Sequence, residues 1–356
     1  MTSAYPSPPQ VSVVVPCFNE EETIAEFCRR MTAACEAAAG GDFEIVLVDD
    51  GSRDGTWPAI ETLAAADPRL VGVRLFRNHG HQLAVTAGLS VAAGARVMLI
   101  DADLQDPPEL LGEMMARMDD GADVVYGRRI SREGESWFKT WTAAKFYRAL
   151  DRLSSVPIPR DTGDFRLMTR RVADILAAMP ERHRFIRGMV SWIGGRQVEL
   201  PYELQARFAG VTKYPLRKMI AFALDAITSF STKPLRIASW LGAAVSAMAF
   251  GLLAYTLIVW LSGDAIPGWA SSLTASSLFA GTQLLVLGIM GEYIGRIVDE
   301  VKRRPLFIIG AVRRGGIDMP LHGAGEPSYD AAIAELRRLH AASGAAVTPP
   351  PSRKAS

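Results

Sequence analysis

The chain has 356 residues, with 39 Lys plus Arg against 38 Asp plus Glu, so its formal net charge of +1 provides no basic field for nucleic acid. The length allows two domains, or one large domain with additions, and a sizeable buried core. The cysteines, Cys17, Cys28 and Cys35, have no metal-ligand spacing, and we expect reduced structural thiols in a cytosolic compartment.

The first half of the chain predicts an alternation of strands and helices. Residues 1–10 are polar and proline-rich without the features of a signal peptide, and we expect a disordered leader. Helices are expected up to about residue 39 and over 83–93, and the apolar runs predict strands at residues 11–15, 43–48, 70–76, 97–100 and 123–126. The spacing predicts a doubly wound α/β domain with a mostly parallel sheet. Glycine-rich dinucleotide and P-loop motifs and a serine-hydrolase elbow are absent from the sequence, which argues against those three enzyme classes.

Charged and amide side chains follow four of these predicted strands. They are Asn19-Glu20, Asp49-Asp50, Asp101-Ala102-Asp103 and Arg128-Arg129. The carboxyl ends of parallel strands meet at one edge of an open sheet, where ligands bind, so we predict a functional site at this edge. Asn19 is also a candidate N-cap for the first helix, and Asp161 to Arg166 is predicted to be a further acidic turn before a helix.

The stretch Asp101 to Asp106 allows two interpretations. Two carboxylates and the amide of Gln105 supply hard oxygen atoms of the kind that Mg²⁺ or Mn²⁺ prefers. Alternatively, the acids and Pro107-Pro108 simply begin the next helix.

Two further segments have amphipathic patterns. Trp137, Trp141 and Lys145 share one helical face, which fits either a helix packed on the sheet or a helix in the membrane interface. Residues 213–236 combine an apolar helical stripe with flanking Lys and Arg, which favours an interfacial helix over a core helix.

The region 237–296 predicts a pair of membrane-spanning helices. Residues 237–261 and 271–290 contain no charged side chain, and each run is long enough to cross a hydrocarbon core of about 30 Å. We expect spans at about 237–261 and 271–294. Lys and Arg flank the pair but are absent from the intervening loop, so the positive-inside rule places both flanks in the cytoplasm. We therefore expect a cytoplasmic domain over 11–212, a cytoplasmic tail over 297–356, and both termini in the cytoplasm.

Four motifs and the helical pair together resemble one enzyme family. The motifs are Val-Pro-Cys-Phe-Asn-Glu-Glu (15–21), Val-Asp-Asp-Gly-Ser-Arg-Asp-Gly-Thr (48–56), Asp-Ala-Asp-Leu-Gln-Asp-Pro-Pro-Glu (101–109) and Asp-Thr-Gly-Asp-Phe-Arg-Leu-Met (161–168). In this order they resemble the family 2 glycosyltransferases of GT-A fold. Arg-Phe-Ile-Arg-Gly (184–188), Val-Thr-Lys-Tyr-Pro (211–215) and the paired spans resemble the bacterial polyprenyl-phosphate glycosyltransferases, relatives of dolichyl-phosphate mannose synthase.

The resemblance implies a role for each matching residue. Catalysis would involve Asp103, Asp164, Arg129 and Arg187, and the metal, Mg²⁺ or Mn²⁺, would be held by Asp103 and Gln105. The acceptor phosphate would contact Arg166, Arg187 and Lys213. The nucleotide sugar would contact Pro16, Phe18, Glu20, Val48, Asp50, Asp101 and Ala102. Phe18 stands where relatives often have Tyr, so it can stack on a base but cannot donate a hydroxyl hydrogen bond.

The implied reaction is an inverting, metal-dependent transfer of a hexose, with glucose from UDP-glucose as the first choice, to undecaprenyl phosphate at the inner membrane. A UDP- or GDP-linked mannosyl, N-acetylhexosaminyl or formamido-arabinosyl donor is an alternative. A processive polysaccharide synthase is disfavoured because two spans are too few for a translocation channel. A non-catalytic membrane scaffold is the remaining alternative, and the resemblance suggests a tetramer in some bacterial members.

Overall fold

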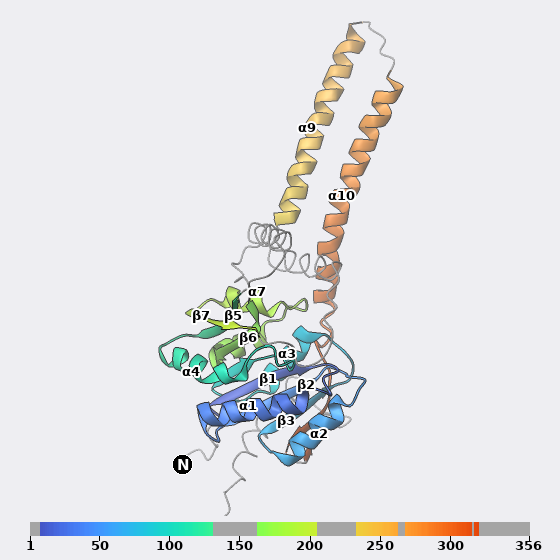
Figure 1. Cartoon of the computed structure of the whole chain (residues 1–356). Helices are drawn as coiled ribbons and strands as arrows, with labels where there is room; N and C mark the ends of the chain where they lie inside the picture. The colour runs from blue at the N-terminus through green and yellow to red at the C-terminus, as the bar shows by residue number, and fades with distance from the viewer. Residues whose placement is uncertain (1–7, 131–161, 205–232, 263–267, 315–316, 320–356) are drawn as a thin grey trace, which may run out of the picture.

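The computed structural model describes residues 8–130, 162–204, 233–262, 268–314 and 317–319 (Figure 1). Its centre is a nine-stranded sheet in the order β7-β5-β6-β4-β1-β2-β3-β8-β9. The strands are β1 (Val11–Cys17), β2 (Phe43–Asp49), β3 (Leu70–Leu75), β4 (Arg96–Leu99), β5 (Val124–Ile130), β6 (Thr162–Thr169), β7 (Gln197–Glu203), β8 (Ile309–Arg314) and β9 (Ile317–Met319). The helices are α1 (Ile24–Ala39), α2 (Thr56–Ala66), α3 (His81–Val91), the 3₁₀ turn η1 (Pro108–Leu110), α4 (Leu111–Asp119), α6 (Arg170–Ala178), α7 (Ile186–Ile193), α9 (Lys233–Leu261) and α10 (Trp269–Val301).

The middle of the sheet is parallel and its flanks are mixed. Strands β4, β1, β2 and β3 run parallel to one another, and β7 runs parallel to β5. Strand β6 is antiparallel to both of its neighbours, β4 and β5. The carboxyl ends of β1, β2, β4, β5 and β7 therefore lie at one edge of the sheet, which we call the site edge. The doubly wound α/β fold predicted from the alternation of elements is confirmed.

Helices cover both faces of the sheet because successive strand residues point to opposite sides. In β1, Val13 and Val15 pack with α1, α2 and α4, whereas Val14 packs on the other face with α3, α6 and α7. The three cysteines lie buried on the α1 side as free thiols, and burial raises the pKa of Cys28 and Cys35 to about 12. They are structural thiols, as expected.

The segment predicted to be an acidic turn before a helix is in fact strand β6, so that prediction was wrong. Asp164 and Arg166 lie on one face of this buried strand, and Phe165 and Leu167 pack into the core on the other. A central strand tolerates the two charged residues because they compensate each other and are hydrogen-bonded. Since β6 is antiparallel, its first residues, rather than its last, lie at the site edge.

Two other local predictions need correction. Asn19 does not cap α1: it has a left-handed backbone (φ 57°), and its Oδ1 accepts a hydrogen bond from Arg53 N at 3.0 Å. Arg128 and Arg129 lie within β5 rather than after it. In addition, strands β8 and β9 come from the range expected to be a tail, and β8 pairs with the edge of β3. Phe307, Ile309 and Val312 are buried there, so this part of the chain belongs to the sheet domain.

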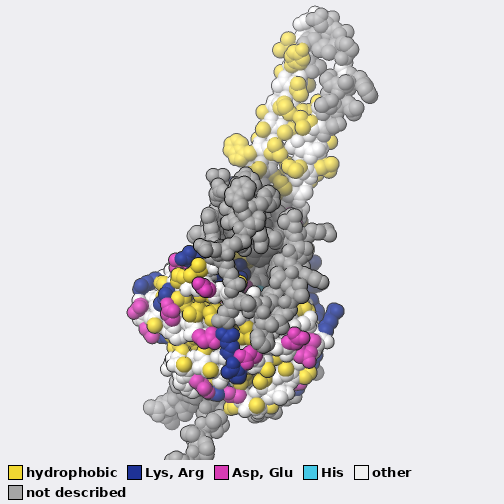
Figure 2. All heavy atoms as spheres, viewed as in Figure 1, with side chains coloured by type: hydrophobic (Ala, Val, Ile, Leu, Met, Phe, Trp, Pro, Cys, Tyr) yellow, Lys and Arg dark blue, Asp and Glu magenta, His cyan; other side chains and the backbone are white. Residues whose placement is uncertain are grey.

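Helices α9 and α10 lie side by side as a hairpin that projects from the sheet domain (Figure 1). Residues 233–255 and 278–301 are long and apolar enough to cross a membrane. Almost none of the residues in these stretches is buried, unlike those of a core helix. Apolar side chains are spread along the coloured part of the hairpin, where no charged side chain is seen (Figure 2). At the base of α10, Glu300 Oε1 accepts from Arg182 N at 2.8 Å, and Asp299 lies 3.4 Å from the ring of His183.

Several predictions concern residues outside the described ranges. These are the leader up to residue 7, the Trp137 and Trp141 face, Lys213, the interfacial helix before residue 233, and the tail beyond residue 319. Their assignments stay predictions.

Gly88 gives a test of how α3 sits on the sheet. A Cβ at this position would meet Val14 Cγ1 at 2.3 Å and Val48 Cγ2 at 3.0 Å, whereas a Cβ at Gly112 in α4 would meet nothing within 4 Å. We expect Gly88→Ala to destabilise the protein by about 1–3 kcal/mol through overpacking. Gly112→Ala should be neutral or stabilising by up to about 1 kcal/mol. Urea unfolding of both variants in detergent measures the difference, and equal stability of the two would contradict this packing.

Candidate active site

The turn after β4 presents alternate side chains to the site edge. Asp101, Asp103 and Gln105 are partly exposed, whereas Ala102, Leu104 and Asp106 are buried. Leu104 has a left-handed backbone (φ 59°) although its side chain is in the core. A non-glycine residue in this conformation is strained by about 1–3 kcal/mol, and such strain clusters at functional sites. The backbone N–H of Gln105 donates to Asp103 Oδ1 at 3.1 Å, which holds the Asp103 carboxylate against the backbone of the turn.

The residues predicted to hold the nucleotide end lie at the ends of β1 and β2. Pro16 and Val48 are register partners and are buried, so they can offer a ligand only their backbone. Phe18 follows and is 44% exposed as a residue, which suits stacking on a base. Glu20 accepts from Thr23 Oγ1 at 2.7 Å. The Asp50 carboxylate accepts from the N–H groups of His79 at 2.7 Å and Gly80 at 2.8 Å, so in this structure it holds the loop before α3.

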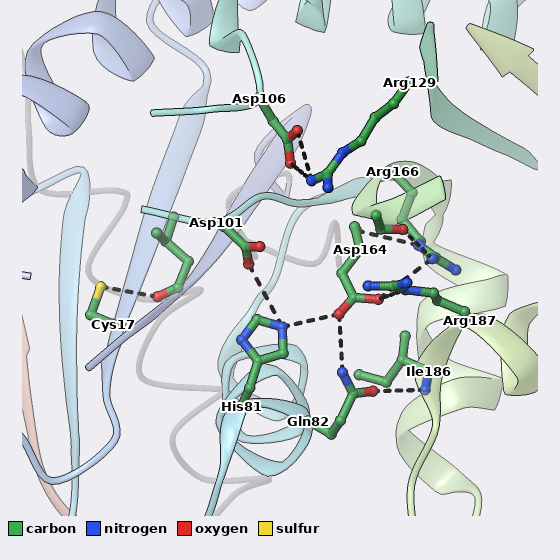
Figure 3. Close-up of polar contacts among 12 residues, drawn as sticks. Cys17, His81, Gln82, Asp101, Asp106, Arg129, Asp164, Arg166, Ile186 and Arg187 are labelled. Atoms are coloured by element: carbon green, nitrogen blue, oxygen red, sulfur yellow. Dashed lines mark hydrogen bonds and ion pairs between the residues drawn. The ribbon is translucent and has the colours of Figure 1, made fainter. Parts of the chain in front are cut away.

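The Asp164 carboxylate lies within hydrogen-bonding distance of His81, Gln82 and Arg187 (Figure 3). Its Oδ2 accepts from Gln82 Nε2 at 3.0 Å and lies 3.0 Å from His81 Nε2. Its Oδ1 accepts from Arg187 Nε at 2.9 Å. His81 Nε2 also lies 3.6 Å from Asp101 Oδ1, which joins this cluster to the acidic turn.

The pKa directions in this cluster follow from burial and charge. Burial opposes ionisation of Asp164, but Arg187, His81 and Arg166 together hold its pKa well below the usual range. Burial likewise opposes the charge of His81, yet the hydrogen bond to Asp164 and the charge of Asp101 raise its pKa to about 9. Burial, together with the carboxylates of Asp164, Asp106 and Asp103, raises the pKa of Asp101 to about 6 although His81 lowers it. At neutral pH, Asp164 is therefore an ionised anchor for two cations.

Arg129 lies on the neighbouring strand and is held by two groups. Its Nη2 donates to Asp106 Oδ1 at 3.2 Å and its Nε donates to the Tyr202 hydroxyl at 3.1 Å. Tyr202 in turn hydrogen-bonds to Asp106, which is 1% exposed. The Arg129 side chain remains about one-third exposed (35%) at the site edge.

The Arg166 side chain is buried next to Asp164 and is not accessible at the site edge. Its side chain is 4% exposed, and it donates to the backbone carbonyls of Gly163 and Asp164. Burial lowers its pKa to about 10. Phosphate binding by Arg166 stays a prediction, and the contacts described here give it a supporting role for Asp164.

Sequence reasoning missed His81, Gln82, Asp106 and Tyr202 as site residues. The signal for His81 and Gln82 was present, because both follow the third strand of the parallel set and therefore reach the same edge. Tyr202 had no such signal, because its place opposite Arg129 depends on the pairing of β7 with β5.

The acidic turn fits a divalent cation that is shared with a substrate. Within the described residues, no three His, Cys, Asp or Glu side chains converge as a complete metal site. Asp103 and Gln105 carry side-chain oxygens of the kind that such a cation prefers. Burial is the main cause of the raised pKa of Asp101, and the neighbouring carboxylates of Asp164, Asp106 and Asp103 add to it. Mg²⁺ in such sites completes its shell with water and substrate phosphates.

The parallel sheet, with an acidic turn and basic side chains meeting at its carboxyl edge, is the arrangement expected of a transferase of GT-A fold. A family model, "Glycosyl transferase family 2", matches residues 12–176. The chain is 45% identical over 301 residues to the Bacillus subtilis glycosyltransferase YkcC, covering 84% of this chain and 93% of that protein. It is 39% identical over 307 residues to the Shigella flexneri SfII prophage-derived bactoprenol glucosyl transferase, and the match covers 86% of this chain and 99% of that protein.

The protein therefore belongs to glycosyl transferase family 2 and is a glycosyltransferase. A solved structure with a more distant likeness is the Pyrobaculum calidifontis mannosyltransferase in complex with GDP-Man and Mn²⁺. It is 18% identical, with a TM-score of 0.41, covering 82% of this chain and 90% of that one.

His81 gives the site a pH-dependent contribution to stability. Its pKa is about 9 in the folded protein and about 6.5 in an unfolded chain, so its ionic contacts stabilise fully below about 6.5. This contribution is lost as the pH rises through 9. We therefore expect the melting temperature of wild type to exceed that of His81→Asn at about pH 6.5, and this difference to shrink as the pH rises to about 9. A difference that grows with pH would contradict the assignment.

Proposed function

We propose that this glycosyltransferase moves a hexose from a nucleotide diphosphate donor to polyprenyl phosphate at the cytoplasmic face of the inner membrane. One observation carries the proposal: an acidic turn and three basic side chains, His81, Arg129 and Arg187, lie together at one edge of the sheet. The same chain has an exposed apolar helical hairpin. The relatives named as bactoprenol glucosyl transferases support a polyprenyl acceptor and favour glucose. UDP-glucose is the first candidate donor.

Asp103 and Gln105 would hold Mg²⁺ or Mn²⁺. When bound, the metal neutralises charge that develops on the departing diphosphate. Asp101 and Ala102 lie beside this position. Phe18 stacks on the base, and the ends of β1 and β2, with Pro16 and Val48, line the nucleoside pocket together with Glu20 and Asp50.

The chemistry is a single in-line displacement with inversion. An oxygen of the lipid phosphate forms the new bond to the anomeric carbon, and the bond from that carbon to the nucleoside diphosphate breaks. Its electron pair leaves with the diphosphate. The attacking phosphate is already ionised near neutral pH, so the reaction needs no strong general base.

Asp164 fits this chemistry as an orienting group. Its carboxylate fixes Arg187 through Nε, and within the described part of the chain the terminal nitrogens of Arg187 make no hydrogen bond. A guanidinium held at one edge can present these nitrogens to phosphate as a bidentate donor. Arg129 offers a second cation at the same edge. Most of the rate acceleration then comes from positioning and charge neutralisation.

The membrane arrangement belongs to the same proposal. The proposal places the site edge at the cytoplasmic face of the membrane, with both flanks of the hairpin on that side, as the distribution of Lys and Arg predicts. The acceptor-phosphate contact predicted for Lys213 falls outside the described residues. A homo-oligomer, a tetramer by resemblance to some bacterial members, is compatible with this arrangement.

A donor screen tests the reaction. Membranes or purified protein are incubated with undecaprenyl phosphate and each labelled UDP- and GDP-sugar, and the lipid-linked product is separated by chromatography. We expect glucose transfer from UDP-glucose. Transfer of only mannose, N-acetylhexosamine or formamido-arabinose would change the sugar but keep the reaction, whereas no product from any donor would favour the scaffold alternative.

Chelation and an Asp103 variant test whether the reaction depends on a divalent metal. We expect EDTA to stop turnover by wild type, and Mg²⁺ or Mn²⁺ to restore it. Asp103→Ala should lower kcat by about 100-fold or more because it removes charge stabilisation at the leaving group. Asp119→Ala is the matched control, because Asp119 pairs with Arg96 on the surface of α4. Full activity of Asp103→Ala in EDTA would overturn the metal-assisted mechanism.

A further inference from the structure

Gln82, in the first turn of α3, bonds to two separate elements of the site (Figure 3). Its Nε2 donates to Asp164 Oδ2 on β6 at 3.0 Å, and its Oε1 accepts from Ile186 N on α7 at 2.8 Å. The partners fix the orientation of this amide, because a backbone N–H can only donate and an ionised carboxylate can only accept.

The bond to Ile186 supplies an acceptor that α7 lacks locally. The first N–H groups of a helix have no acceptor within the helix, and the Phe185 side chain at the N-cap position of α7 provides none. Arg187 is the next residue, and its Nε donates to Asp164 Oδ1 at 2.9 Å. Gln82, Asp164, Arg187 and Ile186 therefore form a closed ring of contacts across three elements.

We propose that Gln82 is a positioning residue for the phosphate-binding end of the site. It holds the Asp164 carboxylate and the start of α7 in one arrangement, and so fixes where Arg187 presents its terminal nitrogens. This inference rests on the proposed function, in which those nitrogens face the acceptor phosphate. A carboxamide suits the task because one planar group carries both a donor and an acceptor. Gln82→Leu removes both, and Gln82→Glu removes the donor and adds a charge against Asp164.

Gln197 provides a matched control at the other end of the same helix. Its Nε2 donates to the carbonyls of Val190 at 2.9 Å and Gly194 at 3.0 Å, where α7 ends. Gln197→Leu therefore weakens α7 as Gln82→Leu does, but it leaves the contacts of Asp164 and Arg187 in place.

The first measurement compares steady-state kinetics of the full-length protein with undecaprenyl phosphate and the donor that wild type uses. We expect Gln82→Leu to lower kcat by about 10- to 100-fold, because small misplacements of reacting groups have effects of this size. The KM for the nucleotide sugar should change by less than about threefold, because the donor-binding contacts are untouched. Gln197→Leu should lower the melting temperature and leave kcat within about threefold of wild type.

The second measurement uses Gln82→Glu. When protonated, the introduced carboxyl offers an O–H to Asp164 and a carbonyl to Ile186 N, as the amide does. Asp164 on β6 opposes its ionisation, whereas His81 on α3 and Arg187 on α7 favour it. We expect Gln82→Glu to lower kcat at pH 7 at least as far as Gln82→Leu does, because the ionised carboxylate still accepts from Ile186 N but repels Asp164.

Each result has a distinct meaning. Wild-type kcat in Gln82→Leu, an equal loss in Gln197→Leu, or wild-type kcat in Gln82→Glu at pH 7 would overturn the positioning role. A wild-type protein that makes no lipid-linked sugar from any donor would instead overturn the proposed function.

Discussion

The site depends on keeping one buried carboxylate ionised. Asp164 is only 5% exposed, and an uncompensated carboxylate in such a place would be neutralised or would destabilise the fold by several kcal/mol. Its compensation comes from three elements: His81 and Gln82 on α3, Arg187 on α7 and Arg166 on β6 itself. Loss of one of these partners would leave the Asp164 charge incompletely compensated. Helices α3 and α7 must therefore pack against β6 together for the site to form. On the proposed function, the same constraint favours an orienting role for Asp164 over proton transfer.

The antiparallel strand β6 is what brings this carboxylate to the right edge. Strands β4 and β5 run in the same direction with β6 reversed between them, so the beginning of β6 lies beside the ends of its neighbours. Asp164 then faces α3 and α7 on one side of the sheet, and Gly163 lies against the Arg129 guanidinium, where an added Cβ would meet Nη2 at 3.0 Å. A parallel strand at this position would have put the same residues at the opposite edge.

Site residues that directly follow an apolar parallel strand could be predicted from the sequence. Those whose position depends on pairing between distant strands were missed. Asp50, Asp101 and Asp103 were found because they directly follow apolar parallel strands. Strand β6 was predicted to be a turn because Asp161-Thr162-Gly163-Asp164 has turn composition. It is a strand because it pairs with β4 and β5, buries Phe165 and Leu167, and has partners for its two charged side chains. Strand β8 was missed because its pairing with β3 joins residues more than two hundred positions apart, which no local pattern records.

Acidic and basic side chains meet within the site, since His81 lies beside Asp101 and Arg129 is bound to Asp106. On the proposed function, the acidic turn would take a diphosphate only together with a cation, while Arg187, His81 and Arg129 would attract phosphate directly. The base of α10 contacts Arg182 and His183, a short distance in sequence before Arg187. On the proposed function, the membrane hairpin is thus connected through the start of α7 to the cation that receives the lipid phosphate.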